Sequence, residues 1–361
     1  LVIGIFLIIV FMREIIQKEA IKIALENKSG TLDVAVRSGK TFIGLSIANG
    51  FKKVLVSYPN NSIKDSWTSD AKKFEFSLNN ITFTTHLSLN KYNLSAFDCI
   101  ILDEIDQVSE AQWLHIIKSA CPRLYGMTGT PANSGIKKKY MEEYCPIIYS
   151  VKLDETVGTL QKDYEIIVHL LEPSTKSDIP LASGKFWSEK AKIQFWDNKY
   201  KKNNNFMDML KLIQSIQNSK TKIEYLKQLS TKIDNKCLIF LETIKQCEEL
   251  EKNELFNCSY HSKNKNSEDN LLAFQIGYSK KLFCVKQLSA GITFKNLNEC
   301  IILHAYASNN KTHQRLARCL NYVEGEKATI HIIGLKGTRD EQWIKKGLAE
   351  FNQDKITYKN I

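Results

Sequence analysis

The strongest constraint on the fold is an alternation of short apolar segments with amphipathic ones, which occurs twice along the 361-residue chain. Each apolar segment has the length of a buried strand, and each following segment has the apolar spacing of a helix. Strands that alternate with helices predict a parallel sheet with helices on both faces. In the first half the expected strands are 32–36, 53–58, 99–104 and 123–130, and the expected helices are 40–50, 62–74 and 110–120.

The same alternation returns in the second half, after a stretch that lacks it. Residues 172–230 are polar and rich in Lys and Asn, and they become helical in pattern from residue 206. Beyond them, strand-like segments at 236–242, 257–261, 281–286, 299–306 and 328–335 alternate with helix-like ones. Two domains are expected, because single cores rarely grow past about 250–300 residues.

The predicted fold class is α/β, with two tandem parallel-sheet domains and a helical insert between them. The expected segments are an apolar N-terminal extension at 1–11, a first domain at 12–150, a connecting strand and helical insert at 151–230, and a second domain at 231–361.

The N-terminal extension is wholly apolar but short. A bilayer-spanning helix needs about 20 residues, and the basic flank and cleavage site of a signal peptide are missing. Met12 opens an amphipathic pattern, so we expect the natural start at Met12 or a fragment of a longer chain. A membrane anchor is the alternative. The nine Cys form no CxxC pair and several lie in apolar strands, which fits a reducing compartment such as the cytoplasm.

The formal net charge of +11 favours polyanionic partners, because a basic surface raises their local concentration. A Lys-rich solvated surface encoded by an AT-rich genome is the plainer explanation, and charge alone does not decide between the two.

Residues 35–41, AVRSGKT, follow an expected strand and precede an expected helix, which is the context of a P-loop. Backbone N–H groups at such a helix N-terminus bind phosphate, Lys40 would reach the terminal phosphates, and Thr41 would offer a hydroxyl to Mg²⁺. Arg37, Ser38 and Gly39 complete the expected phosphate loop. Val34 stands where the strict pattern has Gly, so a chance match is the alternative for this loop taken alone.

An acidic turn supports the P-loop interpretation. Asp103 and Glu104 follow the apolar strand 99–102. A carboxylate at the end of a strand beside a P-loop can hold Mg²⁺, which is the role expected of Asp103. Its neighbour Glu104 can orient or deprotonate the attacking water. The alternative is an acidic turn that only caps the next helix.

A third segment, TGTP at 128–131, ends another expected strand. In order and spacing, GKT at 39–41, DEID at 103–106 and TGTP resemble motifs I, II and III of superfamily 2 helicases. The turn around Pro59, the following Trp67 and the phrase MTGTPANSG resemble the Swi/Snf-type branch. The small size and the AT-rich composition are compatible with a phage or other viral source. The resemblance implies RecA-like domains, ATP and Mg²⁺ as cofactors, and nucleic acid as partner, with DNA expected rather than RNA.

The resemblance also implies roles for further residues of the first half. Gln17 would read the adenine edge, with a plain surface glutamine as the alternative. Motif Ia implies that Pro59 and Asn60 contact nucleic acid, and the same is expected of Thr128 and Thr130. For Trp67 we expect a place in the core.

The second half resembles motifs IV to VI of the same superfamily. KCLIFLET at 236–243 is similar to motif IV, LSAGITF at 288–294 to motif V with Gly291, and THQRLARC at 312–319 to motif VI. The resemblance implies that Gly291 and Gln314 approach the nucleotide and that Arg315 and Arg318 stabilise charge on its γ-phosphate. Asn321 replaces the last Arg of the pattern, so slower or differently coupled hydrolysis is expected. A helix with a basic face is the alternative for 312–319.

The expected function is therefore an ATP-dependent nucleic-acid helicase or translocase located in the cytoplasm, which is the host cytoplasm if the source is viral. Protein partners would supply specificity, and no membrane is expected. A P-loop ATPase with another client, such as a packaging motor, is one alternative. A nucleic-acid-binding protein with impaired turnover is the other, motivated by Val34 and Asn321. The aromatic residues and lysines of 172–230 could stack on a strand or form a small core of their own.

Overall fold

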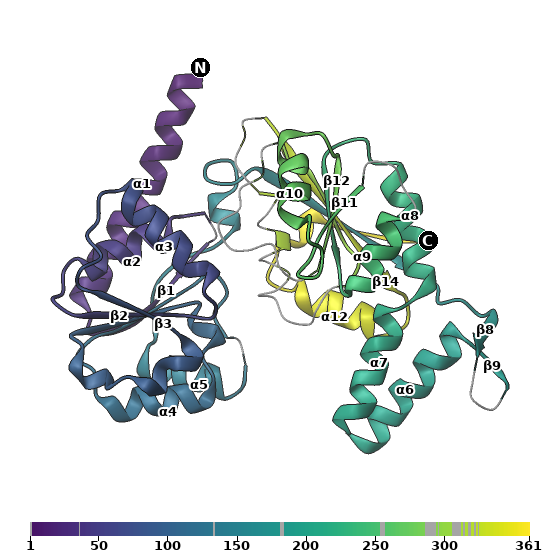
Figure 1. Cartoon of the computed structure of the whole chain (residues 1–361), viewed down its shortest axis with the longest axis horizontal. Coiled ribbons are helices and arrows are strands. Elements are labelled where there is room, and N and C mark those ends of the chain that lie inside the picture. Colours follow the sequence, from purple (N-terminus) through teal and green to yellow (C-terminus); the bar gives the residue numbers. More distant parts are fainter. Residues whose placement is uncertain are drawn as a thin grey trace. The chain divides into compact units, whose positions relative to one another are not determined.

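The computed structural model describes residues 2–35, 37–132, 134–180, 184–252, 257–285, 294, 296–304, 312, 315–316, 319–320, 323 and 325–361. The chain divides into two compact units, and the first contains Leu1–Gln161 while the second begins at Lys162 (Figure 1). Each unit is built on one parallel sheet, which confirms the predicted α/β class with two parallel-sheet domains.

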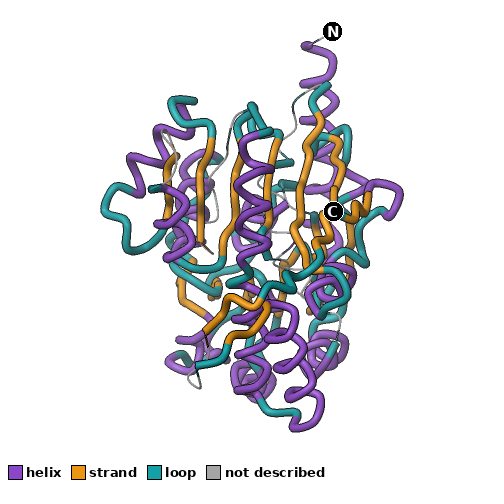
Figure 2. Tube along the Cα trace, turned by 90° about the vertical axis from the view of Figure 1, so that its right-hand side faces the viewer, coloured by secondary structure: helices purple, strands orange, loops and turns teal. Residues whose placement is uncertain are grey.

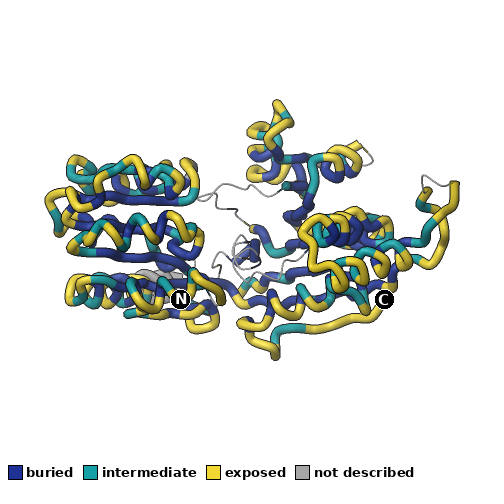
Figure 3. The backbone as a smooth tube through the Cα atoms, turned by 90° about the horizontal axis from the view of Figure 1, so that it is seen from below, coloured by how far each residue is buried: buried dark blue, intermediate teal, exposed yellow. Residues whose placement is uncertain are grey.

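Unit 1 contains a six-stranded sheet in the order β3-β2-β4-β5-β1-β6, and every strand pair in it is parallel. The inner strands β2, β4 and β5 are buried along their whole length, as expected where helices cover both faces (Figure 3). The strands are β1 Ser29–Val34, β2 Val54–Tyr58, β3 Ile81–Thr85, β4 Cys99–Asp103, β5 Leu124–Thr128 and β6 Ile147–Val151.

The described residues of unit 1 form five α-helices: α1 Val2–Glu26, α2 Lys40–Ala48, α3 Ser62–Lys73, α4 Glu110–Ser119 and α5 Gly135–Tyr144. The apolar run at 1–11 does not form a separate element, since from Val2 onward it is the first part of α1. Among the described residues, none of the helices has both the length and the apolar character needed to cross a membrane.

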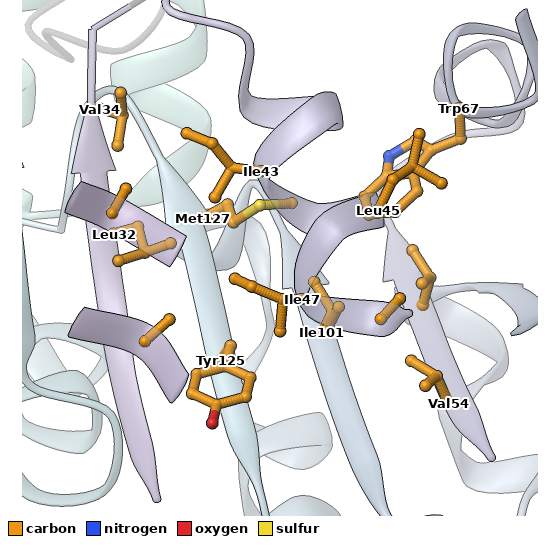
Figure 4. Packing of buried hydrophobic residues seen from close by; sticks show 14 of the residues in the cluster. Leu32, Val34, Ile43, Leu45, Ile47, Val54, Trp67, Ile101, Tyr125 and Met127 are labelled. Carbon is orange, nitrogen blue, oxygen red and sulfur yellow. The ribbon is translucent and has the colours of Figure 1, made fainter. Parts of the chain in front are cut away.

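The main core of unit 1 lies between the sheet and helix α2. Leu32 and Val34 of β1 point to the same face because side chains alternate along a strand, and both are fully buried. Ile43 and Ile47 of α2 lie over this face, and Trp67 of α3 lies beside α2 (Figure 4). Each such aliphatic side chain contributes about 1.5–3 kcal/mol through burial, and together they hold the start of α2 at the end of β1.

Unit 2 contains a seven-stranded sheet in the order β11-β12-β10-β13-β14-β7-β15, again with every strand pair parallel. Its strands run side by side in the tube view (Figure 2). They are β7 Asp163–Leu171, β10 Cys237–Leu241, β11 Asn257–Tyr260, β12 Lys281–Val285, β13 Glu299–Ile302, β14 Lys327–Leu335 and β15 Ile356–Asn360. The α-helices that follow the insert are α8 Lys220–Thr231, α9 Ile244–Glu251, α10 Ser267–Ile276 and α12 Arg339–Gly347.

The helical insert lies within unit 2, whereas the sequence interpretation placed it between the domains. It follows β7, which pairs with β14 on one side and β15 on the other. The unit boundary is accordingly at 161/162 instead of the expected 150/151, because β7 belongs to the second sheet. The insert consists of the antiparallel pair β8 Ser177–Pro180 and β9 Phe186–Ser188, and of helices α6 Glu189–Asn203 and α7 Phe206–Gln217.

The insert is attached to unit 2 through its aromatic residues. Trp196 packs against the core that includes Leu212 and Ile216, and Lys211 lies over its ring at 4.6 Å. Arg339 of α12 forms an ion pair with Asp197 of α6. The contacts therefore support an aromatic core of the insert, while Phe195 remains 45% exposed beside it.

Candidate functional site

The loop between β1 and α2 has two residues in the left-handed region. Arg37 has φ 71°, and Gly39, which caps the N-terminus of α2, has φ 87°. The positive φ of Gly39 favours glycine, and a Cβ atom there would lie 2.1 Å from Nε2 at the end of the Gln17 side chain, which would have to move. Val34, where the strict P-loop pattern has glycine, is buried in β1.

Gln17 of α1 lies against this loop and not on an open surface. Its Nε2 donates to the carbonyl oxygen of Ser38 at 3.0 Å, and the residue is only 8% exposed. The alternative of a plain surface glutamine is therefore wrong, while recognition of adenine by Gln17 stays a prediction.

The loop has a donor group without a partner. The hydroxyl of Ser38 is fully buried and makes no hydrogen bond within the described residues. A buried hydroxyl of this kind usually finds a partner, and a phosphate oxygen would supply one. The first residues of α2, Lys40 and Thr41, stand at the same helix N-terminus, where N–H groups and the helix dipole favour an anion.

Lys40 is directed toward the acidic turn after β4. Its Nζ lies 3.3 Å from Oε1 of Glu104, and both side chains are largely buried. Burial opposes the charge of Lys40, yet the negative charges of Glu104 and Asp103 raise the pKa of its ammonium group. The lysine expected to bind phosphate and the expected catalytic carboxylate are thus adjacent, as the motif spacing predicted.

The carboxylates of this turn repel one another. Burial, and then the charge of Glu104, raises the pKa of both Asp103 and Asp106 to about 6. Bound cationic charge would relieve that repulsion, so the group fits a divalent ion held by Asp103 and Thr41. No cluster of three or more His, Cys, Asp or Glu side chains suited to a metal occurs among the described residues. Mg²⁺ is typically held by one or two protein groups together with phosphate oxygens and water, so a site of Asp103 and Thr41 would need no further protein ligand.

Helix α3 contacts both expected metal ligands, which the sequence interpretation did not foresee. Nε1 of Trp67 donates to Oδ2 of Asp103 at 2.8 Å, and Asp70 lies near the side chain of Thr41. Trp67 is fully buried, so the prediction of a core position is confirmed, but its indole N–H also holds the carboxylate.

His86 holds the same turn through its backbone. Its Nε2 lies 3.0 Å from the carbonyl oxygen of Asp103, and its Nδ1 lies 2.7 Å from the hydroxyl of Ser57. Burial lowers the pKa of His86 to about 4, so the ring is neutral at physiological pH. Nothing in the spacing of these residues along the chain signalled the contact, because it depends on how β2, β3 and β4 are paired.

The expected nucleic-acid contacts divide into exposed and buried residues. Asn60 is exposed and Pro59 partly exposed in the turn after β2, which is compatible with contact. Thr128 is fully buried and its hydroxyl donates to Oδ1 of Asp106 at 2.8 Å, while Thr130 is 6% exposed and donates its N–H to Thr128. The assignment of Thr128 and Thr130 to nucleic acid is therefore not supported, since their polar groups link two loops inside unit 1.

In unit 2, Arg315 is held by its own unit. Nη2 donates to Oε1 of Glu242 at 2.9 Å, and Nη1 donates to the carbonyl oxygen of His304 at 2.8 Å. The guanidinium also lies 5.3 Å from the centre of the Phe240 ring. Gly291, Gln314, Arg318 and Asn321 lie outside the described residues.

Comparison with known proteins bears on both units. Residues 221–322 match the family described as "Helicase conserved C-terminal domain". The DNA 3'-5' translocase XPB2 of Sulfurisphaera tokodaii is 24% identical over 368 residues, covering 90% of this chain and 82% of that protein. The early transcription factor 70 kDa subunit of Melanoplus sanguinipes entomopoxvirus is 32% identical over 143 residues, but these make up only 21% of that protein.

Two solved structures share the fold. The ATP-dependent Type ISP restriction-modification enzyme LlaBIII bound to DNA matches 96% of this chain with a TM-score of 0.65 at 13% identity, and the chain spans 31% of that enzyme. The Pyrococcus furiosus Hef helicase domain matches 92% of this chain and 96% of its own length, with a TM-score of 0.51 at 12% identity.

Proposed function

We propose that the chain is an ATP-hydrolysing helicase of superfamily 2 that couples ATP hydrolysis to movement along DNA. The observation that supports this most directly is the meeting of Lys40 and Glu104 at the carboxyl end of the first sheet. Ligands of open parallel sheets bind at that end. The helicase C-terminal domain then lies in the other unit of the same chain.

We assign the phosphates to the loop of Arg37, Ser38 and Gly39 and to Lys40. Mg²⁺ bound at Asp103 and Thr41 would withdraw charge from the phosphate oxygens. Glu104 would orient the attacking water and accept its proton, because its carboxylate contacts Lys40 and lies beside the proposed phosphate loop. Gln17 would contact the adenine base, since its side chain is hydrogen-bonded to the same loop.

DNA is the proposed track for three reasons. The net charge of +11 suits a polyanion, a relative is described as a DNA translocase, and a structure of the same fold is bound to DNA. The exposed turn at Pro59 and Asn60 is the proposed contact in unit 1. Unit 2 would contribute Arg318, and a role for Gly291 and Gln314 stays a prediction.

ATP turnover measured against single- and double-stranded DNA and RNA tests this function. Stimulation by DNA supports the proposal. An ATPase rate that no nucleic acid changes would favour a P-loop ATPase with another substrate, such as a packaging motor. Nucleic-acid binding without ATP hydrolysis would favour a nucleic-acid-binding protein with impaired turnover. Lys40→Ala should abolish turnover, and Glu104→Gln should bind ATP without hydrolysing it. A normal rate in Glu104→Gln would assign the base elsewhere.

A further inference from the structure

We propose that helix α3 couples the nucleic-acid contact to the metal site, with Trp67 and Asp70 as positioning residues for Asp103 and Thr41. This inference rests on the proposed function. Neither residue belongs to the phosphate loop or to the acidic turn, and the sequence interpretation gave neither a role in ATP turnover.

The first step is the position of the helix. α3 begins at Ser62, directly after the exposed turn of Pro59 and Asn60. Only Asn61 separates that turn from the first residue of the helix. A displacement of the turn is therefore transmitted to the start of the helix. Ile63 is 9% exposed and anchors this end of α3 in the core.

The second step is that one face of α3 meets both expected ligands. Trp67 and Asp70 are three residues apart, so they lie on the same side of the helix. Trp67 donates to Oδ2 of Asp103 at 2.8 Å, and Asp70 lies near the side chain of Thr41. A carboxylate oxygen fixed by the indole leaves Oδ1 for the metal shell, and an acceptor near the Thr41 hydroxyl can orient it so that a lone pair faces a cation.

The third step is rigidity. The Trp67 ring is fully buried, and its Cη2 lies 2.4 Å from where a Cβ on Gly44 would be. It also packs edge-on against Phe83, with ring centroids 6.0 Å apart. Figure 4 shows the ring beside Leu45 of α2. Because interiors are close-packed, Trp67 has no room to turn independently of α3, so a shift of the helix moves the indole N–H relative to Asp103.

The matched pair Trp67→Phe and Trp113→Phe tests the proposal. Both replace a fully buried tryptophan of unit 1, and the indole N–H of Trp113 has no hydrogen-bond partner within the described part of the chain. The measurement is the dissociation constant of a fluorescent ADP, titrated with Mg²⁺ and separately in EDTA, with and without DNA. No hydrolysis is needed for this readout.

Loss of a hydrogen bond to a charged group should raise the Mg²⁺ concentration for half-maximal tightening about tenfold in Trp67→Phe. The EDTA affinity should be unchanged, and Trp113→Phe should match the wild type in both. In the wild type, DNA should lower the required Mg²⁺ concentration, and Trp67→Phe should abolish that effect. Equal Mg²⁺ and DNA dependence in the two phenylalanine variants would overturn the proposal.

Two further outcomes are informative. If Trp67→Phe misfolds, which loss of nucleotide binding in EDTA would reveal, Asp70→Asn provides the test, because it sits on the surface side of the same face and should also raise the Mg²⁺ requirement; an unchanged requirement overturns the proposal. If the ATPase rate of the wild type does not change with nucleic acid while the Mg²⁺ requirement still rises in Trp67→Phe, the positioning role stands and the function as a DNA motor fails.

Discussion

Arg315 and Glu242 form a buried ion pair in unit 2, with Nη2 of the arginine 2.9 Å from Oε1 of the carboxylate. The motif resemblance assigned Arg315 to the γ-phosphate. Within unit 2 the guanidinium contacts Glu242 at the end of β10 and the carbonyl oxygen of His304. The role of Arg315 toward the γ-phosphate stays a prediction, as does that of Arg318, which lies outside the described residues.

Removing one partner of this pair should destabilise unit 2. Glu242→Ala leaves a buried guanidinium without its counter-charge, which costs about 3 kcal/mol, whereas Glu242→Gln keeps an acceptor and should cost less. Urea unfolding of the two variants and of Arg315→Ala, combined in a double-mutant cycle, measures the coupling. A coupling energy near zero would show that the pair is not formed in solution.

The contact between Gln17 and the phosphate loop makes two opposite predictions. Gly39→Ala should abolish ATP binding, because the new Cβ would meet Nε2 of Gln17 at 2.1 Å in a backbone conformation with φ 87°. Gln17→Ala should only weaken ATP binding, by about fivefold, since it removes one hydrogen bond to the loop. Adding Gln17→Ala to Gly39→Ala should restore part of the binding. Both effects are read from nucleotide titrations, and normal binding by Gly39→Ala would contradict the loop geometry.

A histidine in unit 2 predicts a loss of stability in acid. Nε2 of His169 lies 3.0 Å from Nδ1 of His331, and Nε2 of His331 contacts Glu299. Nδ1 of His169 lies 2.9 Å from the hydroxyl of Tyr225. Burial, followed by the charges of His331 and Lys359, lowers the pKa of His169 to about 4.

The unfolded chain therefore binds a proton near pH 6.5 that the folded protein does not accept until about pH 4. The contribution to the unfolding free energy is complete above pH 6.5 and is lost as the pH falls toward 4. His169→Gln keeps polar contacts but does not titrate. Between pH 7.5 and pH 5 its unfolding free energy should therefore fall less than that of the wild type. The difference corresponds to the protonation of one histidine in the unfolded wild-type chain. Parallel pH profiles of the two proteins would refute the assignment.

The aromatic residues of the insert predict a contrast between neighbours. Trp196 packs on the unit 2 core, so Trp196→Ala should lower the unfolding free energy by about 2–3 kcal/mol. Phe195 is 45% exposed, so Phe195→Ala should cost less than about 1 kcal/mol. Chemical denaturation measures both, and equal costs would mean that the insert packs differently.

The sequence predicted those strands whose two faces are both covered. β2, β4, β10 and β13 are nearly continuous apolar runs, because helices cover them above and below. Three strands of the two parallel sheets that were not expected, β3, β6 and β15, are edge strands with mostly half-exposed or exposed residues. Their apolar signal is weak for that reason. The run of β7 is apolar, but its sheet is decided by its partners β14 and β15, which lie far away in the sequence.

The sequence predicted only those parts of the site that lie in recognisable local motifs. Lys40 and Glu104 were expected to be adjacent because the ends of parallel strands share one edge of the sheet, and their contact at 3.3 Å confirms this. The indole of Trp67, the ring of His86 and the carboxylate of Asp70 were missed as parts of the site. Their partners are set by tertiary packing. A tryptophan in the sequence predicts a buried side chain, but it does not predict which residue its indole N–H bonds to.

The place of β7 in the second sheet governs the order in which this unit can fold. β7 is made first, but its neighbours β14 and β15 are the last strands of the chain. During synthesis the earliest strand of unit 2 therefore waits, with both edges unpaired, until β14 and β15 have been made. The strands of the first sheet are all made before that point, so unit 1 can close first. A folded unit 1 is thus tethered to an open sheet until β14 and β15 pair with β7.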